Sequence, residues 1–206
     1  MKRITQEFTI DYQQILSETP IGDIDKKIKF LADRLTCEWL EHYNNMTPHL
    51  TNVCRFYYGE FEYIFDHYTE LEQKGIEAYN PKIEDRVVAA FGRSSPTNKD
   101  RESSRLKGWI GPTEKKLGAN TDKGHFIAHK IGGKLDVNIF AQRRDLNQGR
   151  SPQGKIYISM ERYCSLHPRT FCFNRPLYSD FTSRPTMIEF GVLINDDKFW
   201  IERFEN

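Results

Sequence analysis

The chain has no long hydrophobic run. No stretch of it approaches about 18 consecutive apolar residues, the length that a membrane-spanning helix requires. The basic pair Lys2 and Arg3 near the start is followed by no apolar run, so a secretory signal peptide is not expected. We therefore expect a cytoplasmic protein without a membrane partner, an expectation that still allows delivery by a specialised export system.

Cysteine is also scarce. The 206 residues include four cysteines, and none forms a C-x-x-C pair. Without a signal peptide, reduced thiols are the default. Cys164, His167 and Cys172 lie close enough in the sequence to suggest zinc, but a structural zinc site needs four ligands and no fourth lies nearby. Two interpretations stay open: a zinc-stabilised interaction protein, and thiols that only pack.

Repeats and low-complexity tracts are absent, and the charge is unevenly distributed. Residues 1–85 carry seven more acidic than basic side chains, and residues 86–206 carry eight more basic than acidic ones. A basic surface raises the local concentration of a polyanionic partner. The pattern predicts an acidic N-terminal region of unknown role and a basic C-terminal domain that binds nucleic acid.

The apolar pattern of the first half predicts helices. Between residues 23 and 43, apolar residues recur at spacings of three and four, which is typical of a helix. A second stripe of the same kind, between residues 53 and 71, predicts another helix. Residues 92–120 are polar and rich in Gly, Ser, Lys and Pro, so loops are expected there. Residues 1–85 are thus expected to form a small helical region.

The second half predicts strands around one helix. Residues 125–128 and 137–141 read as two short strands on either side of a Gly-Gly turn, and a helical pattern follows over residues 153–166. Further strands are expected at 170–178, 186–194 and 198–204. Strand, turn, strand and helix followed by more strands indicate an α+β fold with an antiparallel sheet.

The window from residue 122 to 147 holds the parts that phosphodiester hydrolysis requires. His125 is the candidate general base, because a neutral imidazole at physiological pH can take a proton from water. Asn138, 13 residues later, is the candidate metal ligand, since Mg²⁺ prefers oxygen donors. Gly124 lets the chain bend or lets substrate approach the backbone.

Other residues near the window are expected to support these two. Gln142 and Asn147 are placed to orient a metal-bound water or to hold Asn138, and Glu161 on the following helix is placed to hold such a water. His129 is expected to be a supporting or core residue rather than a ligand. The candidates for phosphate contact are all cationic: Lys123, Arg143, Arg144 and Arg150.

These motifs together resemble a known family. Asp122-Lys123-Gly124-His125, then Asn138-x-x-x-Gln142, then Asn147 is similar to the DNA/RNA non-specific endonuclease family of ββα-metal, or His-Me finger, nucleases. The resemblance implies a ββα finger over about residues 122–165 with His125 as general base. It also implies Asn138 as direct ligand of Mg²⁺, or of another divalent cation such as Mn²⁺, with Asn147 and Glu161 near the metal.

The resemblance implies an endonuclease that cuts DNA, RNA or both with little sequence specificity. Such enzymes resemble bacterial toxins or defence effectors, which implies an inhibitor or immunity protein as a partner. Lys123 stands where the family has Arg, and Ala141 stands where it has Pro. These two departures motivate an alternative, a nucleic-acid-binding module that kept the finger and lost the chemistry.

Overall fold

The structure is a computed structural model, and it describes residues 9–97 and 118–206. The expected loops at residues 92–120 therefore lie largely outside the described residues. The helices and strands follow one another as α1 (Tyr12–Ser17), α2 (Ile24–Met46), β1 (Val53–Tyr58), β2 (Phe61–Asp66), α3 (Glu70–Gln73), β3 (Arg86–Arg93), β4 (Thr121–His125), the 3-10 turns η1 (His129–Ile131) and η2 (Asp136–Asn138), β5 (Ile139–Arg143), α6 (Arg144–Asn147), α7 (Pro152–Leu166), β6 (Phe171–Leu177), β7 (Met187–Ile194) and β8 (Lys198–Glu205).

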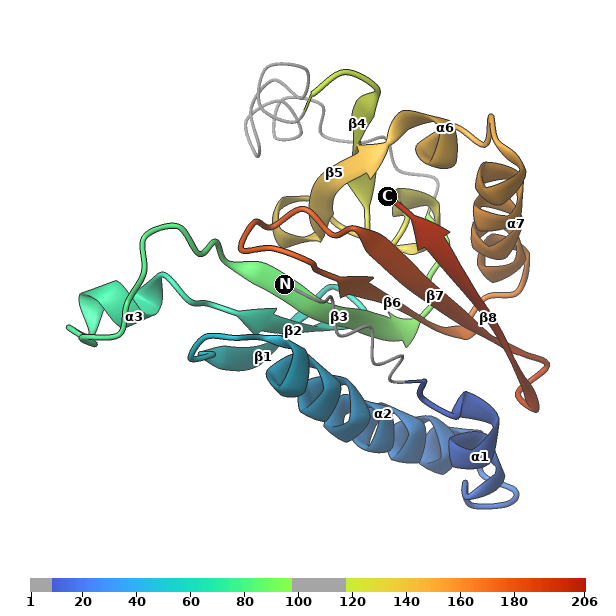
Figure 1. Cartoon of the computed structure of the whole chain (residues 1–206). Coiled ribbons are helices and arrows are strands. Elements are labelled where there is room, and N and C mark those ends of the chain that lie inside the picture. The colour runs from blue at the N-terminus through green and yellow to red at the C-terminus, as the bar shows by residue number, and fades with distance from the viewer. Residues whose placement is uncertain (1–8, 98–117) are drawn as a thin grey trace.

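A six-stranded antiparallel sheet organises the molecule. Its strand order is β1-β2-β3-β6-β7-β8, and β4 and β5 form a separate two-stranded sheet. Figure 1 shows α1 and α2 on one side of the large sheet and β4, β5, α6 and α7 on the other. The chain is therefore a mixed α+β protein with an antiparallel sheet, as the sequence predicts. No helix among the described residues is long and apolar enough to cross a membrane.

Each face of the large sheet has its own hydrophobic core, because successive residues of a strand point to opposite sides. In β6, Phe171 and Phe173 belong to the core under α2, whereas Cys172 belongs to the core under α7. Trp39 of α2 packs its ring 4.9 Å from that of Phe173. Full burial of one such large side chain stabilises the fold by roughly 1.5 to 3 kcal/mol.

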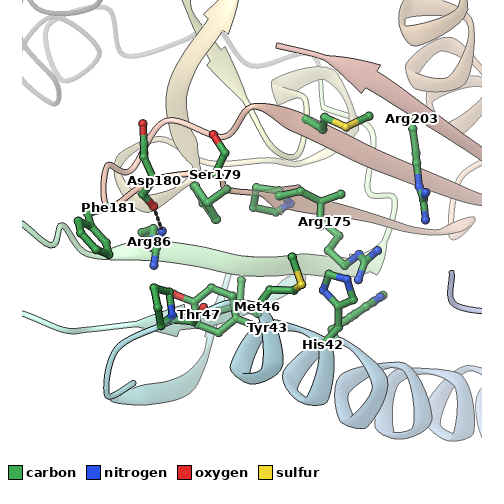
Figure 2. A pocket seen from close by; sticks show the side chains of 17 residues that line it. His42, Tyr43, Met46, Thr47, Arg86, Arg175, Ser179, Asp180, Phe181 and Arg203 are labelled. Atoms are coloured by element: carbon green, nitrogen blue, oxygen red, sulfur yellow. Dashed lines mark hydrogen bonds between the residues drawn. The ribbon is translucent and has the colours of Figure 1, made fainter. Parts of the chain in front are cut away.

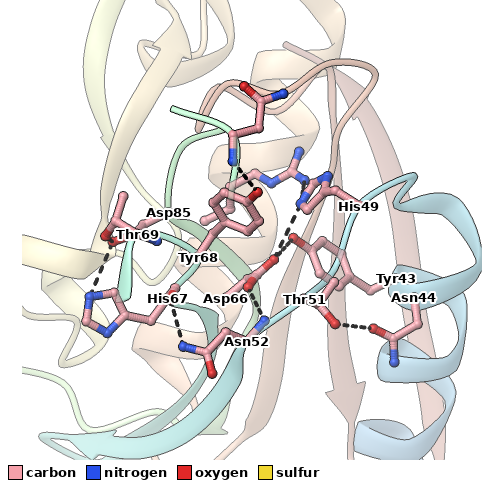
Figure 3. A network of polar contacts seen from close by, with 12 residues as sticks. Tyr43, Asn44, His49, Thr51, Asn52, Asp66, His67, Tyr68, Thr69 and Asp85 are labelled. Atoms are coloured by element: carbon pink, nitrogen blue, oxygen red, sulfur yellow. Dashed lines mark hydrogen bonds and ion pairs between the residues drawn. The ribbon is translucent and has the colours of Figure 1, made fainter. Parts of the chain in front are cut away.

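Helix α2 confirms the helix predicted from residue 23 to 43. Asp23 caps its first turn by accepting backbone N–H bonds from Asp25 and Lys26. Its other end is tied to the sheet through Asp66, a fully buried carboxylate of β2 (Figure 3). Asp66 accepts a hydrogen bond from the Tyr43 hydroxyl at 2.7 Å and another from the backbone N–H of Asn52 at 2.8 Å.

The helix predicted between residues 53 and 71 is wrong. That stretch forms the hairpin β1–β2, in which Tyr58 pairs with Phe61 across a two-residue turn. Gly59 occupies the turn with a φ of 69°, a left-handed conformation that ends regular structure. The aromatic and β-branched residues happen to recur at helical spacing, but such residues favour a pleated, half-buried surface.

The hairpin also joins the two halves of the sequence. Strand β2 is hydrogen-bonded to β3 along its length, so strands from before and after residue 85 share one sheet. The predicted division between residues 1–85 and 86–206 thus falls between two adjacent strands rather than between separately packed units.

The C-terminal elements match the prediction closely. The three expected strands are β6, β7 and β8, and the expected helix is α7. Ser151 caps α7 by accepting a hydrogen bond from the backbone N–H of Gly154 at 3.0 Å. Its buried side is centred on Tyr157, Met160 and Cys164, whereas Ile156 is 38% exposed.

The two short strands are displaced from their predicted positions. Strand β4 ends at His125, where the predicted strand begins, and β5 starts at Ile139. The outer edge of β5 is held by Asn206, which follows β8. Its side-chain oxygen accepts from the N–H of Arg143 at 2.8 Å, and its amide nitrogen donates to the carbonyl of Ala141 at 2.9 Å.

Candidate active site

The motif residues lie on the hairpin β4–β5, on the loop that joins its two strands and on the helices α6 and α7 that follow it. In the β4–β5 ladder, Asp122 pairs with Gln142 and Gly124 pairs with Phe140. A β-carbon on Gly124 would collide with the side chain of Gln142, including its own β-carbon. Gly124 therefore provides the close approach that allows the buried Gln142 side chain to lie across the strand.

His125 ends β4 and is 6% exposed. Its backbone carbonyl accepts a hydrogen bond of 3.4 Å from the hydroxyl of Tyr157, which comes from the middle of α7. Burial, and next the negative charge of Glu161, raise the pKa of Tyr157 far above its ordinary value. Tyr157 therefore stays a neutral donor, and the carboxylate of Glu161 lies close enough to affect it.

Asn138 is fully buried, and its amide is bound to the backbone on both sides. Its oxygen accepts from the N–H of Ile127 at 2.8 Å, and its nitrogen donates to the carbonyls of Ile127 at 2.8 Å and of Lys134 at 2.7 Å. A metal ligand must offer its oxygen to the ion. The oxygen of Asn138 is instead buried and hydrogen-bonded to the backbone, so this placement does not suit the predicted role of direct metal ligand. It is a clamp that closes the loop between β4 and β5.

Asn147 is the amide that the structure leaves available. It lies half-buried at the end of α6, and its nitrogen donates to the Oδ2 of Asp122 at 3.3 Å. Because the nitrogen of the amide faces Asp122, its oxygen is turned away from that carboxylate. Asn147 therefore replaces Asn138 as the candidate metal ligand.

Asp122 accepts hydrogen bonds from several side chains in this part of the site. Its Oδ1 accepts from the Nε of Arg144 at 2.9 Å, and its Oδ2 also accepts from Gln148 at 2.7 Å. Burial raises the pKa of Asp122, but the hydrogen bonds from Arg144, Gln148 and Asn147 outweigh it and hold that pKa below its ordinary value. Asp122 is thus ionised at neutral pH and fixes α6 against β4.

The four predicted phosphate-binding cations are in different situations. Arg143 donates to Asp145 at 2.6 Å and to Gln153 at 3.0 Å, and Arg144 is paired with Asp122. Arg150 is exposed. Lys123 is half-buried on β4, and burial lowers the pKa of its ammonium group. The exposed Arg150 is therefore the candidate most open to a phosphate.

The remaining predicted supporting residue, His129, does not lie on a strand. It opens the 3-10 turn η1, is partly exposed and follows β4 by four residues. The residue sits in the loop that Asn138 closes, and its supporting role stays a prediction.

The cysteines are not arranged as a zinc site with His167. Cys164 and Cys172 are both buried, and a hydrogen bond with Cys164, followed by burial, raises the pKa of Cys172 well above its ordinary value. The ring of His167 is instead exposed, stacks on Tyr163 with centroids 4.1 Å apart and hydrogen-bonds the Tyr163 carbonyl at 2.9 Å. Within residues 9–97 and 118–206, no group of three or more His, Cys, Asp or Glu side chains is placed to hold a metal ion.

Two site residues escape prediction from the sequence. Tyr157 reads as an ordinary apolar position of an amphipathic helix, and nothing in the spacing indicates the role of its hydroxyl. Asn174 donates to the carbonyl of Phe126 at 2.9 Å and to Tyr157 at 3.3 Å. A polar residue in the middle of an apolar strand is the one signal that points to Asn174, because buried amides require partners.

Comparison with known proteins gives a distant structural similarity to a nuclease. No family model and no curated protein matches the chain. A solved structure described as Sda1 nuclease with bound zinc ion aligns with 75% of this chain and 74% of that chain, at 15% sequence identity and a TM-score of 0.37. A similarity of this size is too low to carry residue roles from one chain to the other.

Proposed function

We propose that this protein is a metal-dependent nuclease that hydrolyses phosphodiester bonds of DNA, RNA or both. The observation that carries the proposal is that both neighbouring helices bind the motif strand β4 directly. Asp122 holds the amide of Asn147 from α6, and the carbonyl of His125 accepts the hydroxyl of Tyr157 from α7. The charge of Glu161 lies beside that hydroxyl. The imidazole of His125, the amide oxygen of Asn147 and the carboxylate of Glu161 are thereby held near β4, a strand of five residues.

His125 is the general base of this proposal. Its neutral imidazole takes a proton from the attacking water, a step that typically contributes about 10²- to 10⁴-fold in rate. The hydrogen bond from Tyr157 fixes the backbone of His125, and Gln142 packed on Gly124 fixes the preceding residue. A base held in this way loses little orientation between turnovers.

The donor set fits a hard divalent cation such as Mg²⁺ or Mn²⁺. The Oδ1 of Asn147 is the direct ligand in this proposal, and Glu161 holds water around the ion. Mg²⁺ characteristically keeps several waters and takes few protein ligands, which agrees with so small a set. When bound, the ion supplies positive charge that stabilises the phosphate in the transition state.

The substrate class follows from the charges near β4. Lys123 and the exposed Arg150 offer positive charge to phosphates, and backbone contacts of this kind carry no base information. Little sequence specificity is therefore proposed. An unselective nuclease endangers the cell that makes it, so we further propose a toxin or defence role, with an inhibitor or immunity protein as partner.

The test compares cleavage by the wild type with two variants, His125→Ala and Asn147→Ala. Plasmid DNA, single-stranded DNA and RNA are incubated with Mg²⁺, with Mn²⁺ and with chelator. Cleavage is expected only with metal, and each variant should lose at least about 100-fold in rate. His167→Ala is the matched control, because it removes an exposed histidine outside the site.

Thermal unfolding of each variant separates loss of chemistry from loss of fold. A folded His125→Ala protein that cleaves like the wild type would remove His125 from the mechanism. A folded wild type that leaves every substrate intact but binds DNA in a salt-dependent manner would favour the binding module instead.

A further inference from the structure

A second site lies on the face of the sheet that α2 covers. A cavity of about 710 Å³ opens between the C-terminal half of α2 and the ends of β3, β6 and β7 (Figure 2). Ligand pockets in proteins are typically about 300 to 1,000 Å³. The finger formed by β4, β5 and α7 lies on the other face, so this cavity is separate from the candidate active site.

Arg175 supplies the strongest sign of a missing partner. Its side chain is 2% exposed, and its Nε donates to the Oε1 of Glu189 at 2.9 Å. Its two terminal nitrogens, Nη1 and Nη2, are buried and make no hydrogen bond within the described parts of the chain. Figure 2 shows Arg175 extending from the sheet toward His42 on α2. Buried guanidinium donors are normally satisfied, so this fork is poised for an acceptor that the protein does not provide.

The charges around Arg175 favour an anion. Glu189 is fully buried and is shared by two guanidinium groups, Arg175 at 2.9 Å and Arg203 at 2.7 Å, so its carboxylate engages Arg175 only through Nε. Burial, and then the positive charge of Arg175, lower the pKa of His42 to about 4, while Glu189 opposes this and Arg203 adds to it. His42 is therefore neutral at pH 7 and does not compete with Arg175 for the anion.

The terminal nitrogens of Arg86, the other buried guanidinium of the cavity, have partners within the protein, although its Nε has none among the described residues. Arg86 donates to the carbonyl of Asp180 at 2.7 Å and is linked through His49 to the buried carboxylate of Asp66 (Figure 3). The carboxylate of Asp180 accepts hydrogen bonds from the N–H and the hydroxyl of Thr182 at 2.8 and 2.7 Å. Among the described residues of the cavity, the two unpaired terminal nitrogens therefore lie at the Arg175 end.

The rest of the cavity is apolar or aromatic. Met46, Pro176 and Met187 line it, and Tyr43 and Tyr178 lie on either side of the Arg86 guanidinium, at 5.6 and 4.7 Å from ring centroid to Cζ. A free inorganic ion would fill only the charged end. The shape requires a molecule with a charged head and an apolar or flat aromatic body.

We propose that this cavity binds a small organic anion whose carboxylate or phosphate head is held by the terminal nitrogens of Arg175. The apolar or aromatic body of the ligand lies along Met46 and Met187 toward the Tyr43–Tyr178 end. Carboxylate and phosphate oxygens both match the planar fork of an arginine, and the body of the ligand decides between them.

The experiment measures binding by calorimetry and by the shift in unfolding temperature, in chelator, with paired probes. Octanoate and AMP carry the two head groups, octanol and adenosine are their uncharged counterparts, and inorganic phosphate is a head without a body. At least one of the two organic anions should bind ten times more tightly than its uncharged counterpart and than inorganic phosphate. Binding should weaken as salt is added.

Three variants locate that binding. Arg175→Gln removes the fork, and Met46→Trp fills the cavity from an exposed position on α2 without touching the buried charges; each should weaken binding at least tenfold. Arg169→Gln removes one exposed arginine elsewhere and should bind like the wild type. If Arg175→Gln does not fold, the binding measured with Met46→Trp tests the proposal.

The proposal is overturned if neither anion outbinds its uncharged counterpart, or if Met46→Trp binds like the wild type. Loss of AMP binding in Asn147→Ala would also overturn it for AMP, because it would assign that binding to the candidate active site. Retained binding in Asn147→Ala supports the cavity.

Discussion

Two adjacent residues of β6 show how differently the two faces of the sheet use buried polar groups. Asn174 points toward the finger, and its amide nitrogen is satisfied by the carbonyl of Phe126 and the hydroxyl of Tyr157. Arg175 points toward α2, and its terminal nitrogens find no acceptor among the described residues. On the finger face, buried polar groups hold a loop and a helix in place. On the α2 face, Arg175 leaves two terminal donors that the proposed anion would satisfy.

The same contrast separates Asn138 from Glu189. The amide of Asn138 makes three hydrogen bonds to backbone groups of one loop. Glu189 accepts from side chains of three elements: Tyr12 of α1, Arg175 of β6 and Arg203 of β8. The first arrangement shapes a local segment, and the second joins distant parts of the fold around a charge.

The largest expected effect is that of Glu189→Gln. This change disrupts the buried charge cluster on the side of the sheet that α2 covers and leaves the side that carries β4, β5 and α7 intact. It leaves two guanidinium groups without their buried carboxylate, and breaking a buried charge cluster costs about 3 to 5 kcal/mol. Urea unfolding at pH 7 measures the loss. Nuclease activity of the protein that remains folded should be unchanged, and a selective loss of activity would contradict the separation of the faces.

The shifted pKa of Glu189 also predicts how the stability of the protein depends on pH. Burial raises its pKa, but the charge of Arg175 and the hydrogen bonds from Tyr12 and Arg203 outweigh burial, so the folded-state pKa lies below the ordinary value. The carboxylate thus stabilises the fold above the pKa of the unfolded chain, about 4.3, and this contribution is lost as the pH falls through the lower folded-state pKa. Urea titrations below pH 5 should show a shallower loss of stability in Glu189→Gln than in the wild type.

Asn138→Ala disrupts only the side of the sheet that carries β4, β5 and α7. It leaves one buried N–H and two carbonyls without their partner, for an expected cost of about 2 to 4 kcal/mol in unfolding free energy. Nucleic-acid cleavage should fall sharply, because the loop after His125 is released. Binding of the organic anion should be unchanged, and a parallel loss would show that the two faces are coupled.

Gly124→Ala sharpens the comparison within the finger. The new methyl group collides with Gln142, and overpacking of this kind costs about 1 to 3 kcal/mol. The double variant Gly124→Ala, Gln142→Gly, which also removes the β-carbon of residue 142, should recover part of that stability in urea unfolding. If the double variant is no more stable than the single one, the collision is not the cause.

The smallest expected effect is that of Arg150→Ala. The residue is exposed, so the free energy of unfolding should change by less than about 0.5 kcal/mol. If Arg150 contacts phosphate, the slope of log affinity for DNA against log salt should fall by about 1. Lys155→Ala, an exposed lysine on α7, is the matched control.

The sequence predicts those elements in which the spacing of the apolar residues matches the positions that are buried. Helix α2, helix α7 and the three C-terminal strands follow from such spacing, and the His125 window follows from residue chemistry. The hairpin β1–β2 does not, because its aromatic residues recur at helical spacing while Gly59 turns the chain. Asn138 and Asn147 are chemically identical, and only the folded loop decides which amide the backbone uses.

The cavity is not predictable from any local pattern. Its lining comes from residues between Trp39 and Arg203, which are brought together by the sheet order. Arg175 and Glu189 are ordinary charged residues in the sequence. Their burial depends on strand pairing between β6 and β7, which local periodicity does not encode.

Asn206 has a consequence for the behaviour of the protein in concentrated solution. Strand β5 uses alternate backbone groups to pair with β4, through Asn138 and Arg144, and turns those of Ala141 and Arg143 the other way. An open strand edge of that kind recruits strands from neighbouring molecules. The amide of Asn206 imitates a peptide group and pairs with the Ala141 carbonyl and the Arg143 N–H, so we expect this one side chain to reduce edge-to-edge self-association of the finger.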